Sequence, residues 1–390
     1  MPLLEVTDAR LAKLFLKLPA ALHRAVPQYI GPLENEVEAV FDPAKNARLA
    51  NGEAIRWVYV DADSGEALGR VAAFLHYDAP DVQHPDLPVG GLGFFECVHD
   101  QAIANQLFDA ARQWLARRGM QAMDGPINFG ERDRFWGLLI DGYERAPNYG
   151  MFWHPPYYRT LFEQYGFQIF FKQYTYYRTT AEALHPRFAE QAAAHAGRFR
   201  FAHARKQEPE RLARDFHHVY NLAWGRHAGV QPMSLAQAQA LVREMRPVLD
   251  ERLLWFAYHD DEPVAFFISL PELNQIFRHV GPRLNLWGKL RFLWYRWRYR
   301  RRPDKRMFGI IYGVVPDYQG KGVDAAMLHH ARPRLEAAGY ADIEMNWIGD
   351  FNPRMMVTTR SIGARIVKTH ATYRYLFDRE RVFERSPIIK

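Results

Sequence analysis

The chain has 390 residues, of which 48% are hydrophobic and 24% are charged, so it is long enough for two globular domains and is not of a disordered composition. A single cysteine, Cys97, excludes a disulfide framework and a metal site built from cysteines. The net charge of +7 is concentrated in residues 289–302, which contain seven Lys and Arg and no acid, so the basicity needs a local explanation.

The N-terminal segment lacks the uniform apolar core of a signal peptide, because Glu5 and Asp8 interrupt it. No run of 18 apolar residues occurs that would predict a transmembrane helix. Together with the lone cysteine, these features favour a protein of the reducing cytoplasm.

The first half of the chain alternates predicted strands with predicted helices. Residues 55–60 and 67–75 predict a hairpin, and residues 92–98 predict a third strand. A helix is predicted over residues 101–118, where Gly119 ends it. A shorter helix opens at Pro155-Pro156-Tyr157 and ends at Gly166.

The second half repeats this order. Ser234 is a predicted N-cap, with Gln237 in the capping-box position. Strands are predicted at 198–205, 252–259, 263–270, 307–315, 341–348 and 364–377, and helices at 209–224, 234–247, about 322–337 and after Asn352-Pro353. We therefore expect an α/β fold of two similar domains, each a mixed sheet with helices on both faces. The limits are 1–180 and 198–390, with a linker near 180–197 and a basic insertion at 281–305.

The segment Gln319-Gly320-Lys321-Gly322-Val323-Asp324 joins strand 307–315 to the helix that follows it. The first N–H groups of a helix are unpaired and carry partial positive charge, so a tight turn onto them can hold a phosphate. Glycines allow the anion to approach, since a Cβ would block it. Before the turn, Val314-Val315-Pro316 lets the strand end early, because Pro316 has no N–H to donate. The sequence predicts a pyrophosphate site, although a turn of this kind also serves as a plain connection.

This segment resembles the pyrophosphate motif Gln/Arg-x-x-Gly-x-Gly/Ala of the GNAT superfamily of N-acyltransferases. Gln319 and Gly322 match, and Asp324 departs from the Gly or Ala of the pattern. The order of elements from the strand at 307 to Ser361-Ile362-Gly363-Ala364 is also similar to the superfamily. In the first half, His99-Asp100-Gln101-Ala102 stands where the phosphate loop would be, so the whole chain resembles a tandem GNAT protein whose first half has lost that loop.

The resemblance implies that acyl-CoA is the donor substrate. The expected binding residues are Val314, Val315, Gln319, Gly320, Lys321, Gly322, Val323, Asp324 and Asn352. A backbone N–H near Val314 is expected to polarise the thioester carbonyl.

Aminolysis of a thioester also requires a base that removes a proton from the acceptor ammonium. Glu344, on the strand at 341–348, is the first candidate, Asp350 the second and Glu96 the third. The alternative for Glu344 is a surface carboxylate, because it alternates with Ile343 and Met345. Tyr312 and Tyr373 are candidate acids. The histidines show no metal-ligand spacing with an acidic third ligand, so no metal is expected.

The basic insertion has the pattern of an amphipathic helix. Leu286, Leu290, Leu293, Trp294 and Trp297 share one helical face. Trp and Tyr favour the bilayer interface and Arg side chains extend to headgroups, so this pattern indicates an in-plane helix on an anionic membrane. The predicted membrane-binding residues are Trp287, Leu290, Leu293, Trp294, Trp297, Arg298, Arg300, Arg301 and Arg302. Two alternatives remain: a stripe packed on its own domain, and a contact with nucleic acid, which the leucines disfavour.

Further short motifs resemble the bacterial ceramide synthases, which are GNAT-type enzymes. These are Gly125-Pro126-x-Asn128, Pro155-Pro156-Tyr157-Tyr158, Pro271-x-x-Asn274 and the phosphate loop with its acid. The resemblance implies N-acylation of a sphingoid base by fatty acyl-CoA. It also implies a lipid amine as acceptor and a cytoplasmic protein attached peripherally to the inner membrane. The alternatives are an acyltransferase for a small soluble amine, an aminoacyl-tRNA-dependent transferase, and a non-catalytic scaffold at the membrane.

Overall fold

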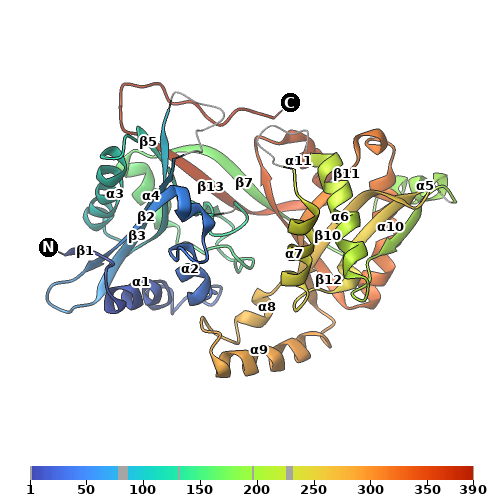
Figure 1. The fold of residues 1–390 in the computed structure, drawn as a ribbon, viewed down its shortest axis with the longest axis horizontal. Coiled ribbons are helices and arrows are strands. Elements are labelled where there is room, and N and C mark those ends of the chain that lie inside the picture. Colours follow the sequence, from blue (N-terminus) through green and yellow to red (C-terminus); the bar gives the residue numbers. More distant parts are fainter. Residues whose placement is uncertain (1, 78–86, 131, 196, 225–231, 390) are drawn as a thin grey trace.

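The computed structural model describes residues 2–77, 87–130, 132–195, 197–224 and 232–389, and one mixed sheet runs through all of it (Figure 1). Its strands follow the order β1-β2-β3-β4-β5-β13-β7-β12-β11-β10-β9-β8, and β6 pairs with β13 beside this path. The strands are β1 (Leu3–Glu5), β2 (Gly52–Val60), β3 (Ala67–His76), β4 (Val89–Cys97), β5 (Ala122–Gly125), β6 (Leu138–Asp141), β7 (Gln168–Thr179), β8 (Arg200–His203), β9 (Leu254–His259), β10 (Glu262–Pro271), β11 (Lys305–Val314), β12 (Tyr340–Gly349) and β13 (Arg365–Leu376).

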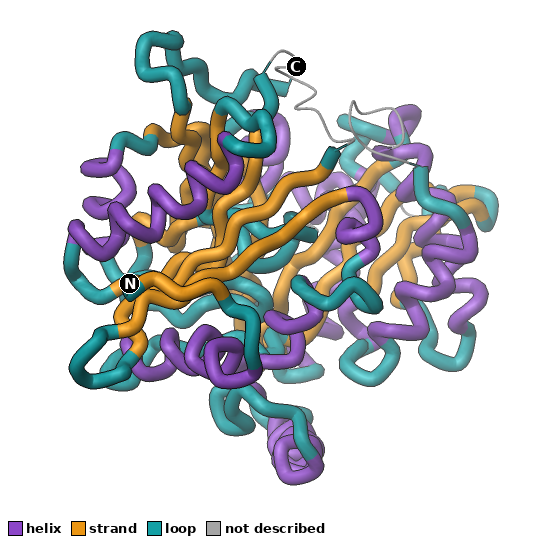
Figure 2. Tube along the Cα trace, turned by 60° about the vertical axis from the view of Figure 1, so that its left-hand side comes forward, coloured by secondary structure: helices purple, strands orange, loops and turns teal. Residues whose placement is uncertain are grey.

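Helices cover both faces of this sheet (Figure 2). They are α1 (Ala9–Leu22), α2 (Glu34–Val40), α3 (Gln101–Ala116), α4 (Tyr157–Tyr165), α5 (Arg187–Ala194), α6 (Pro209–Trp224), α7 (Leu235–Met245), α8 (Asn274–Phe277), α9 (Leu286–Tyr299), α10 (Val323–Ala337) and α11 (Pro353–Ser361). Strand β3 shows why two helical layers form. Its successive side chains point to opposite faces, so Val71 and Ala73 pack in the cluster of α3 and α4, whereas Ala72 and Phe74 pack in the cluster of α1 and α2. The predicted α/β class, with helices on both faces, is confirmed.

The two halves of the chain exchange strands at the centre of the sheet. Strand β7, from the first half, pairs with β12 of the second, and β13, at the end of the chain, pairs with β5 of the first. Strands β7 and β13 also pair with each other in antiparallel direction, at the middle of Figure 1. The sheet is therefore continuous across the predicted boundary, and the limits 1–180 and 198–390 stay a prediction.

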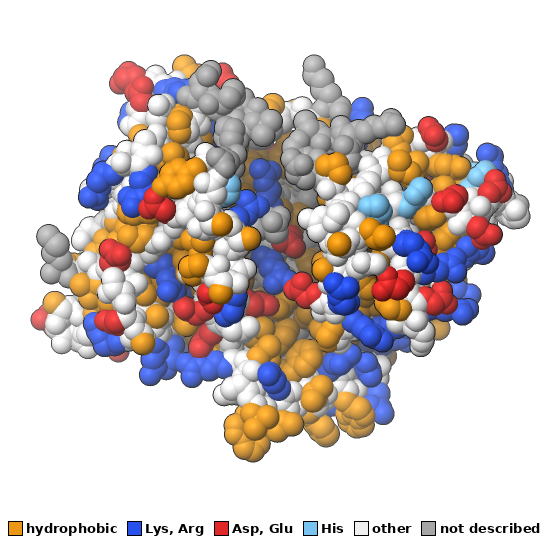
Figure 3. Space-filling view, in the orientation of Figure 1, with side chains coloured by type: hydrophobic (Ala, Val, Ile, Leu, Met, Phe, Trp, Pro, Cys, Tyr) orange, Lys and Arg blue, Asp and Glu red, His pale blue; other side chains and the backbone are white. Residues whose placement is uncertain are grey.

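The insertion at 281–305 forms α9 below the body of the molecule, with Gly288, Phe292, Tyr295 and Tyr299 turned inward. The other face is open to solvent, and Figure 3 shows hydrophobic side chains gathered at this lower edge. The exposed side chains are Leu286, Trp287, Leu290, Leu293, Trp294 and Trp297. The predicted apolar stripe therefore does not pack on its own domain, and different aromatic residues fasten the helix to the body.

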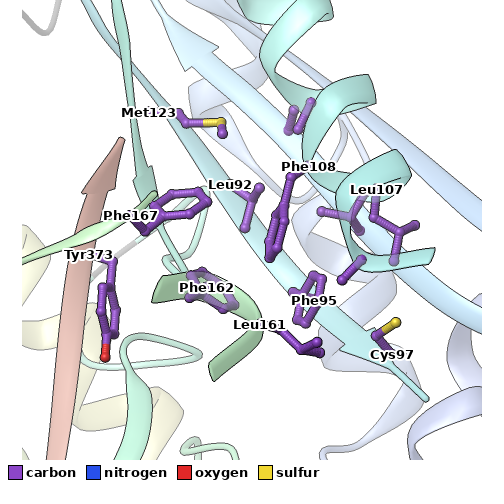
Figure 4. Packing of buried hydrophobic residues seen from close by; sticks show 14 of the residues in the cluster. Leu92, Phe95, Cys97, Leu107, Phe108, Met123, Leu161, Phe162, Phe167 and Tyr373 are labelled. Carbon is purple, nitrogen blue, oxygen red and sulfur yellow. The ribbon is translucent and has the colours of Figure 1, made fainter. Parts of the chain in front are cut away.

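The largest core of the first half lies between α3, α4 and the sheet (Figure 4). The rings of Phe95 and Phe108 stack with their centroids 4.7 Å apart, and Phe162 meets both edge-on. Tyr373, from β13, completes this cluster. The last strand of the chain is therefore held in the core of the first half as well as by its backbone pairing.

Candidate functional site

Strands β11 and β12 separate before either of them ends. They pair in parallel from Lys305 and Tyr340 up to Gly309 and Met345, and no further pair follows. Beyond this point β12 is irregular: its register against β7 shifts between Met345 and Ile348, and Trp347 has a positive φ of 71°. A bulge bends one strand away from its neighbour. The carboxyl ends of β11 and β12 therefore diverge, as the early strand end at Val314-Val315-Pro316 predicts.

Helix α10 begins at this opening, and no side chain of the described residues caps it. Its N-cap is Gly322, with a φ of 77°, and the turn before it contains Gly320, with a φ of 69°. Apart from Gly320 itself and its two chain neighbours, no atom of the described chain lies within 4 Å of the position that a Cβ of residue 320 would take. The Gln319 side chain donates to the carbonyl oxygen of Val314 at 2.9 Å and closes the turn onto β11. An uncapped helix start that follows glycines in left-handed conformation presents N–H groups suited to an anion.

Helix α3, the equivalent helix of the first half, differs at this same place. The carboxylate of Asp100 accepts hydrogen bonds from the N–H groups of Ala102 and Ile103, at 2.8 and 3.1 Å. The chain's own acid therefore occupies the donors that a phosphate would need. Of these two helices, only α10 leaves the N–H groups of its first turn without a side-chain cap, so that they can bind an anion.

Asp324, the residue that departs from the GNAT pattern, lies in the first turn of α10 and accepts a hydrogen bond from the Tyr312 hydroxyl. Burial and the charge of Asp324 raise the pKa of Tyr312 well above its usual value. Asp324 thus points toward β11, where a tyrosine satisfies it. Tyr312 holds its proton firmly, which makes it a poor general acid at neutral pH.

Helix α5 forms a wall of the phosphate loop, although it lies inside the segment predicted as a linker. Its Gln191 reaches Gly322 so closely that a Cβ there would lie 2.1 Å from the side-chain oxygen. His195, which follows α5, bonds through Nε2 to the Lys321 carbonyl oxygen at 2.5 Å. The sequence did not predict this contact, because nothing in residues 187–194 indicates which surface they cover.

Glu344 is fully buried rather than exposed, so the alternative of a surface carboxylate is wrong. Its Oε2 accepts from Lys368 and Asn148, each at 2.7 Å, and its Oε1 lies 3.0 Å from Arg145 and 3.1 Å from Arg306. Burial alone would raise its pKa, but Lys368 and Arg306 overcome that and lower the pKa to about 2. Glu344 is therefore a permanent anion and a weak base.

Glu272, which the sequence patterns did not single out, is the second carboxylate of this network. Asn148 donates to it at 2.9 Å through the same side-chain nitrogen that serves Glu344. The N–H groups of Tyr149 and Asn274 donate to its other oxygen, at 2.9 and 3.0 Å. Burial raises the pKa of Glu272, and the charge of Glu344 raises it further. The pKa of Glu272 is thus raised and the pKa of Glu344 is lowered, a difference that is typical of pairs of catalytic carboxyl groups.

The other predicted catalytic residues have different partners. Glu96 is buried in the first half, bonded to His23 at 2.9 Å and to the Tyr158 hydroxyl at 2.8 Å. Asp350 accepts from the Lys172 N–H and pairs with Arg385 at the surface. Neither shares a hydrogen-bond partner with Glu344, so the three candidates do not form one cluster. Asn352 caps α11 by accepting from the Met355 N–H at 3.1 Å.

Asn346 lies in the irregular part of β12, beside the opening. Both side-chain amide atoms are buried, and neither has a hydrogen-bond partner in the described chain. Such groups are rare in folded proteins, because leaving them unpaired costs about 1–3 kcal/mol each. Asn346 is therefore a candidate to receive a polar group of a ligand. An asparagine within an apolar strand pattern was the signal that could have found it.

Two further features are absent from the described residues. None of their helices is both long and apolar enough to cross a bilayer. Nor do three or more His, Cys, Asp or Glu of these residues gather in a way that could hold a metal ion.

Comparisons with known proteins bear on the whole chain, although no family model matches it. Over 368 residues it is 25% identical to the bacterial ceramide synthase of Caulobacter vibrioides, covering 93% of this chain and 94% of the relative. A fungal multi-domain GH3 β-N-acetylglucosaminidase with a GCN5-related glucosamine N-acetyltransferase region aligns with a TM-score of 0.55 and 11% identity, over 96% of this chain and 38% of that one. A tandem GNAT protein of the clavulanic acid biosynthesis pathway aligns with a TM-score of 0.54 and 11% identity, over 96% of this chain and 98% of that one.

Proposed function

The chain has the tandem GNAT fold, and we propose that it is an acyl-CoA-dependent N-acyltransferase whose acceptor is the amine of a sphingoid base at a membrane surface. The observation that supports donor binding most directly is the contrast between two helix starts. Asp100 caps α3, whereas the start of α10 has two glycines and no side-chain cap. An acyl-CoA pyrophosphate fits the second and would be repelled by the first.

In this proposal the donor enters along the opening between β11 and β12. The pyrophosphate binds the N–H groups from Gly320 to Asp324, and the exposed Lys321 adds positive charge. The pantetheine chain lies between the separated strands, where Asn346 supplies an amide to pair with one of its amide groups. Val314, Val315 and Asn352 stay predicted contacts of the donor.

The choice of acceptor rests on the relative and on α9. The Caulobacter vibrioides relative carries the name bacterial ceramide synthase and matches nearly the full length of this chain. A fatty acyl donor and a sphingoid base both partition into membranes, so an enzyme that uses them benefits from a surface that binds lipid. The open apolar face of α9, flanked by arginines, has that chemistry. We propose that the protein attaches peripherally to an anionic membrane through this face.

Glu272 is our candidate for the group that takes the proton from the acceptor ammonium. A base works best when its pKa lies near the working pH, and burial moves Glu272 in that direction while Glu344 is moved away from it. Glu344 then acts as the fixed anion that anchors Lys368 and Asn148 around Glu272. The free amine attacks the thioester carbonyl, an amide forms, and CoA leaves as the thiol.

We expect Glu272→Gln to lower the turnover rate by about 10²–10⁴-fold without weakening acyl-CoA binding. Glutamine keeps a carbonyl oxygen for the Tyr149 and Asn274 N–H groups and loses only the hydrogen bond from Asn148, and unchanged acyl-CoA binding would show that the fold is retained. The turnover rate is measured as product formed over fixed times, and binding of palmitoyl-CoA is measured by calorimetry. Glu272→Asp should restore part of the rate. Full activity of Glu272→Gln would exclude this residue as the base.

The reaction itself is tested with purified protein, one donor and one acceptor at a time, and mass spectrometry of the products. Palmitoyl-CoA with sphinganine should give the N-acyl product, whereas acetyl-CoA with a small soluble amine should give none. Product from the soluble amine would favour a small-molecule acyltransferase. Neither turnover nor CoA binding would favour a non-catalytic scaffold.

Membrane attachment is tested by changing Trp287, Trp294 and Trp297 to Ser. These rings are exposed in the free protein, so the fold should not change, but their burial in the bilayer would be lost. We expect binding to anionic vesicles, measured by co-sedimentation, to fall more than about tenfold. Val357→Ser with Val382→Ser, two exposed apolar residues elsewhere, is the control and should bind as the wild type does. Equal binding by the tryptophan variant would contradict membrane docking.

A further inference from the structure

A second basic region lies behind α9, in a cavity of about 320 Å³ at the other end of β11 from the phosphate loop. Lys305, the first residue of β11, and Tyr340, the first residue of β12, form its inner wall, and α9 forms its outer wall. Five basic side chains line the cavity: Lys206, Arg252, Arg296, Arg300 and Lys305. The acids among its lining residues are Asp250 and Glu251.

Most of this positive charge has no ion-pair partner among the residues that the structure describes. Arg252 is held by Asp250 through two hydrogen bonds, at 2.8 and 2.5 Å, so this pair is neutral. Glu251 accepts from the backbone N–H of Lys206 rather than from its ammonium group. In the described chain no ion pair reaches the side chains of Lys206, Arg296, Arg300 or Lys305. Four cations therefore meet around one cavity with a single acid besides the neutral pair.

Lys305 is the most deeply buried of these cations and has little to stabilise its charge. It is only 2% exposed, and its ammonium donates a single long hydrogen bond, 3.3 Å, to the Arg300 carbonyl oxygen. Burial lowers the pKa of Lys305 and that of Lys206; the charge of Asp250 raises the pKa of Lys206, and those of Arg296 and Arg300 lower it. A cluster of like charges that burial and mutual repulsion disfavour is relieved when an anion binds among them.

The surroundings indicate which anion would fit. Leu273, Ile276 and Phe292 line the same cavity, so an apolar wall adjoins the cations. On α9 the cavity face carries Phe292, Arg296 and Tyr299, and the opposite face exposes the tryptophans proposed to enter the bilayer. A phosphate that is linked to glycerol and acyl chains would place its charge among the cations while its chains follow the outer face of α9.

We propose that this cavity is a binding site for the phosphate headgroup of an anionic phospholipid, separate from the acyl-CoA site. The proposal rests on the membrane attachment through α9 that is proposed above. It adds a site that binds one lipid molecule to the general attraction between α9 and an anionic membrane. Bound lipid would offset part of the positive charge of Lys305 and of Arg296 and Arg300 on α9. The helix would then be fastened to the start of β11 by lipid as well as by its own aromatic residues.

The test compares two double variants of one helix. R296Q/R300Q removes two cations that line the cavity, and R298Q/R301Q removes two exposed cations that do not. Both lose the same net charge, so both should lose about 30-fold in binding to anionic vesicles at low salt from charge alone, at about 1 kcal/mol per Arg, and R296Q/R300Q should lose more because it also removes the headgroup site. They should differ with a soluble ligand, dihexanoyl phosphatidic acid below its micelle concentration, measured by calorimetry.

Wild type and R298Q/R301Q should bind one equivalent of this short lipid with affinities within about twofold of each other, and R296Q/R300Q should bind at least about tenfold more weakly. Absence of binding to the wild type, or an equal loss in both variants, would overturn the headgroup site. Inorganic phosphate that binds as tightly as the short lipid would overturn its assignment to a lipid. Acyl transfer in detergent micelles without anionic lipid reports on the proposed reaction separately, so failure of one proposal is distinguishable from failure of the other.

Discussion

Replacing Glu344 with Gln should lower the free energy of unfolding by about 3–5 kcal/mol, the range expected when one partner of a buried ion pair is removed. The carboxylate is completely buried, and Lys368, Arg145 and Arg306 surround it. Lys368 is buried as well, so its ammonium would stay in the interior without its direct ion-pair partner. Chemical denaturation monitored by tryptophan fluorescence measures the loss.

Glu336→Gln is the matched control, because it removes a carboxylate from an ion pair with Arg332 on the surface of α10. Exposed pairs of this kind contribute at most about 1 kcal/mol. Glu344→Gln combined with Lys368→Met should recover part of the stability, since no unpaired ammonium remains. Equal losses for Glu344→Gln and Glu336→Gln would contradict the buried network.

Glu344 also predicts that the free energy of unfolding falls at acidic pH. The pKa of Glu344 falls from 4.5 to about 2 on folding, so the unfolded chain binds its proton first. The stabilisation is fully present above pH 4.5 and is lost as the pH falls toward 2. The free energy of unfolding of the wild type should therefore decline over this interval more steeply than that of Glu344→Gln. Parallel declines would mean that the carboxyl is not held as an anion.

The sequence predicted those parts of the fold that depend on local patterns. The capping box at Ser234 and Gln237 starts α7, and Gly339 follows α10, as the patterns predicted. The tandem GNAT prediction is confirmed at the level of the fold. The strand, turn and helix around Gln319 were also predictable, because glycine allows positive φ angles in a turn and proline lacks the N–H that a strand would donate.

Other features depend on contacts between distant residues, and the sequence did not predict them. The exchange of β7 and β13 pairs Tyr373 with Gly125, and no local pattern encodes such a partner. Alternation along β12 placed Glu344 opposite Ile343 and Met345 and suggested exposure. Helices cover both faces of this sheet, so the opposite face is buried too. Helices α1 and α2 were missed as well.

Glu272 illustrates how the site itself escapes prediction. A glutamate after a strand is ordinarily exposed, and only the folded chain brings Asn148 and Glu344 to it. Its neighbours in sequence, Pro271 and Asn274, form the motif Pro271-x-x-Asn274, but this motif does not indicate a role for Glu272. The structure shows what Asn274 does: its N–H donates to Glu272, and its side chain donates to the Pro147 carbonyl oxygen.

Replacing Gly320 with Leu should weaken acyl-CoA binding by more than about 100-fold while the protein stays folded. Each hydrogen bond to a charged group contributes about 1.5–3 kcal/mol, and a side chain in the turn would displace the phosphate from at least two N–H groups. The space beside Gly320 is open, so the leucine Cβ meets no atom of the described chain. Calorimetry with palmitoyl-CoA measures the loss.

Gly65 provides the matched control. It lies in the turn between β2 and β3 with a φ of 70°, compared with 69° for Gly320, and the space within 4 Å of its Cβ position is likewise open. Leucine at either position bears the same left-handed backbone strain, about 1–2 kcal/mol, so the two variants should lose similar stability. Gly322 is less suited to this test, because Gln191 touches it and a substitution would disturb α5. Since strain is matched and only the location differs, loss of acyl-CoA binding in Gly320→Leu alone assigns the pyrophosphate to the start of α10. Equal binding by Gly320→Leu and Gly65→Leu would remove the phosphate from this turn and, with it, the main support for the proposed reaction.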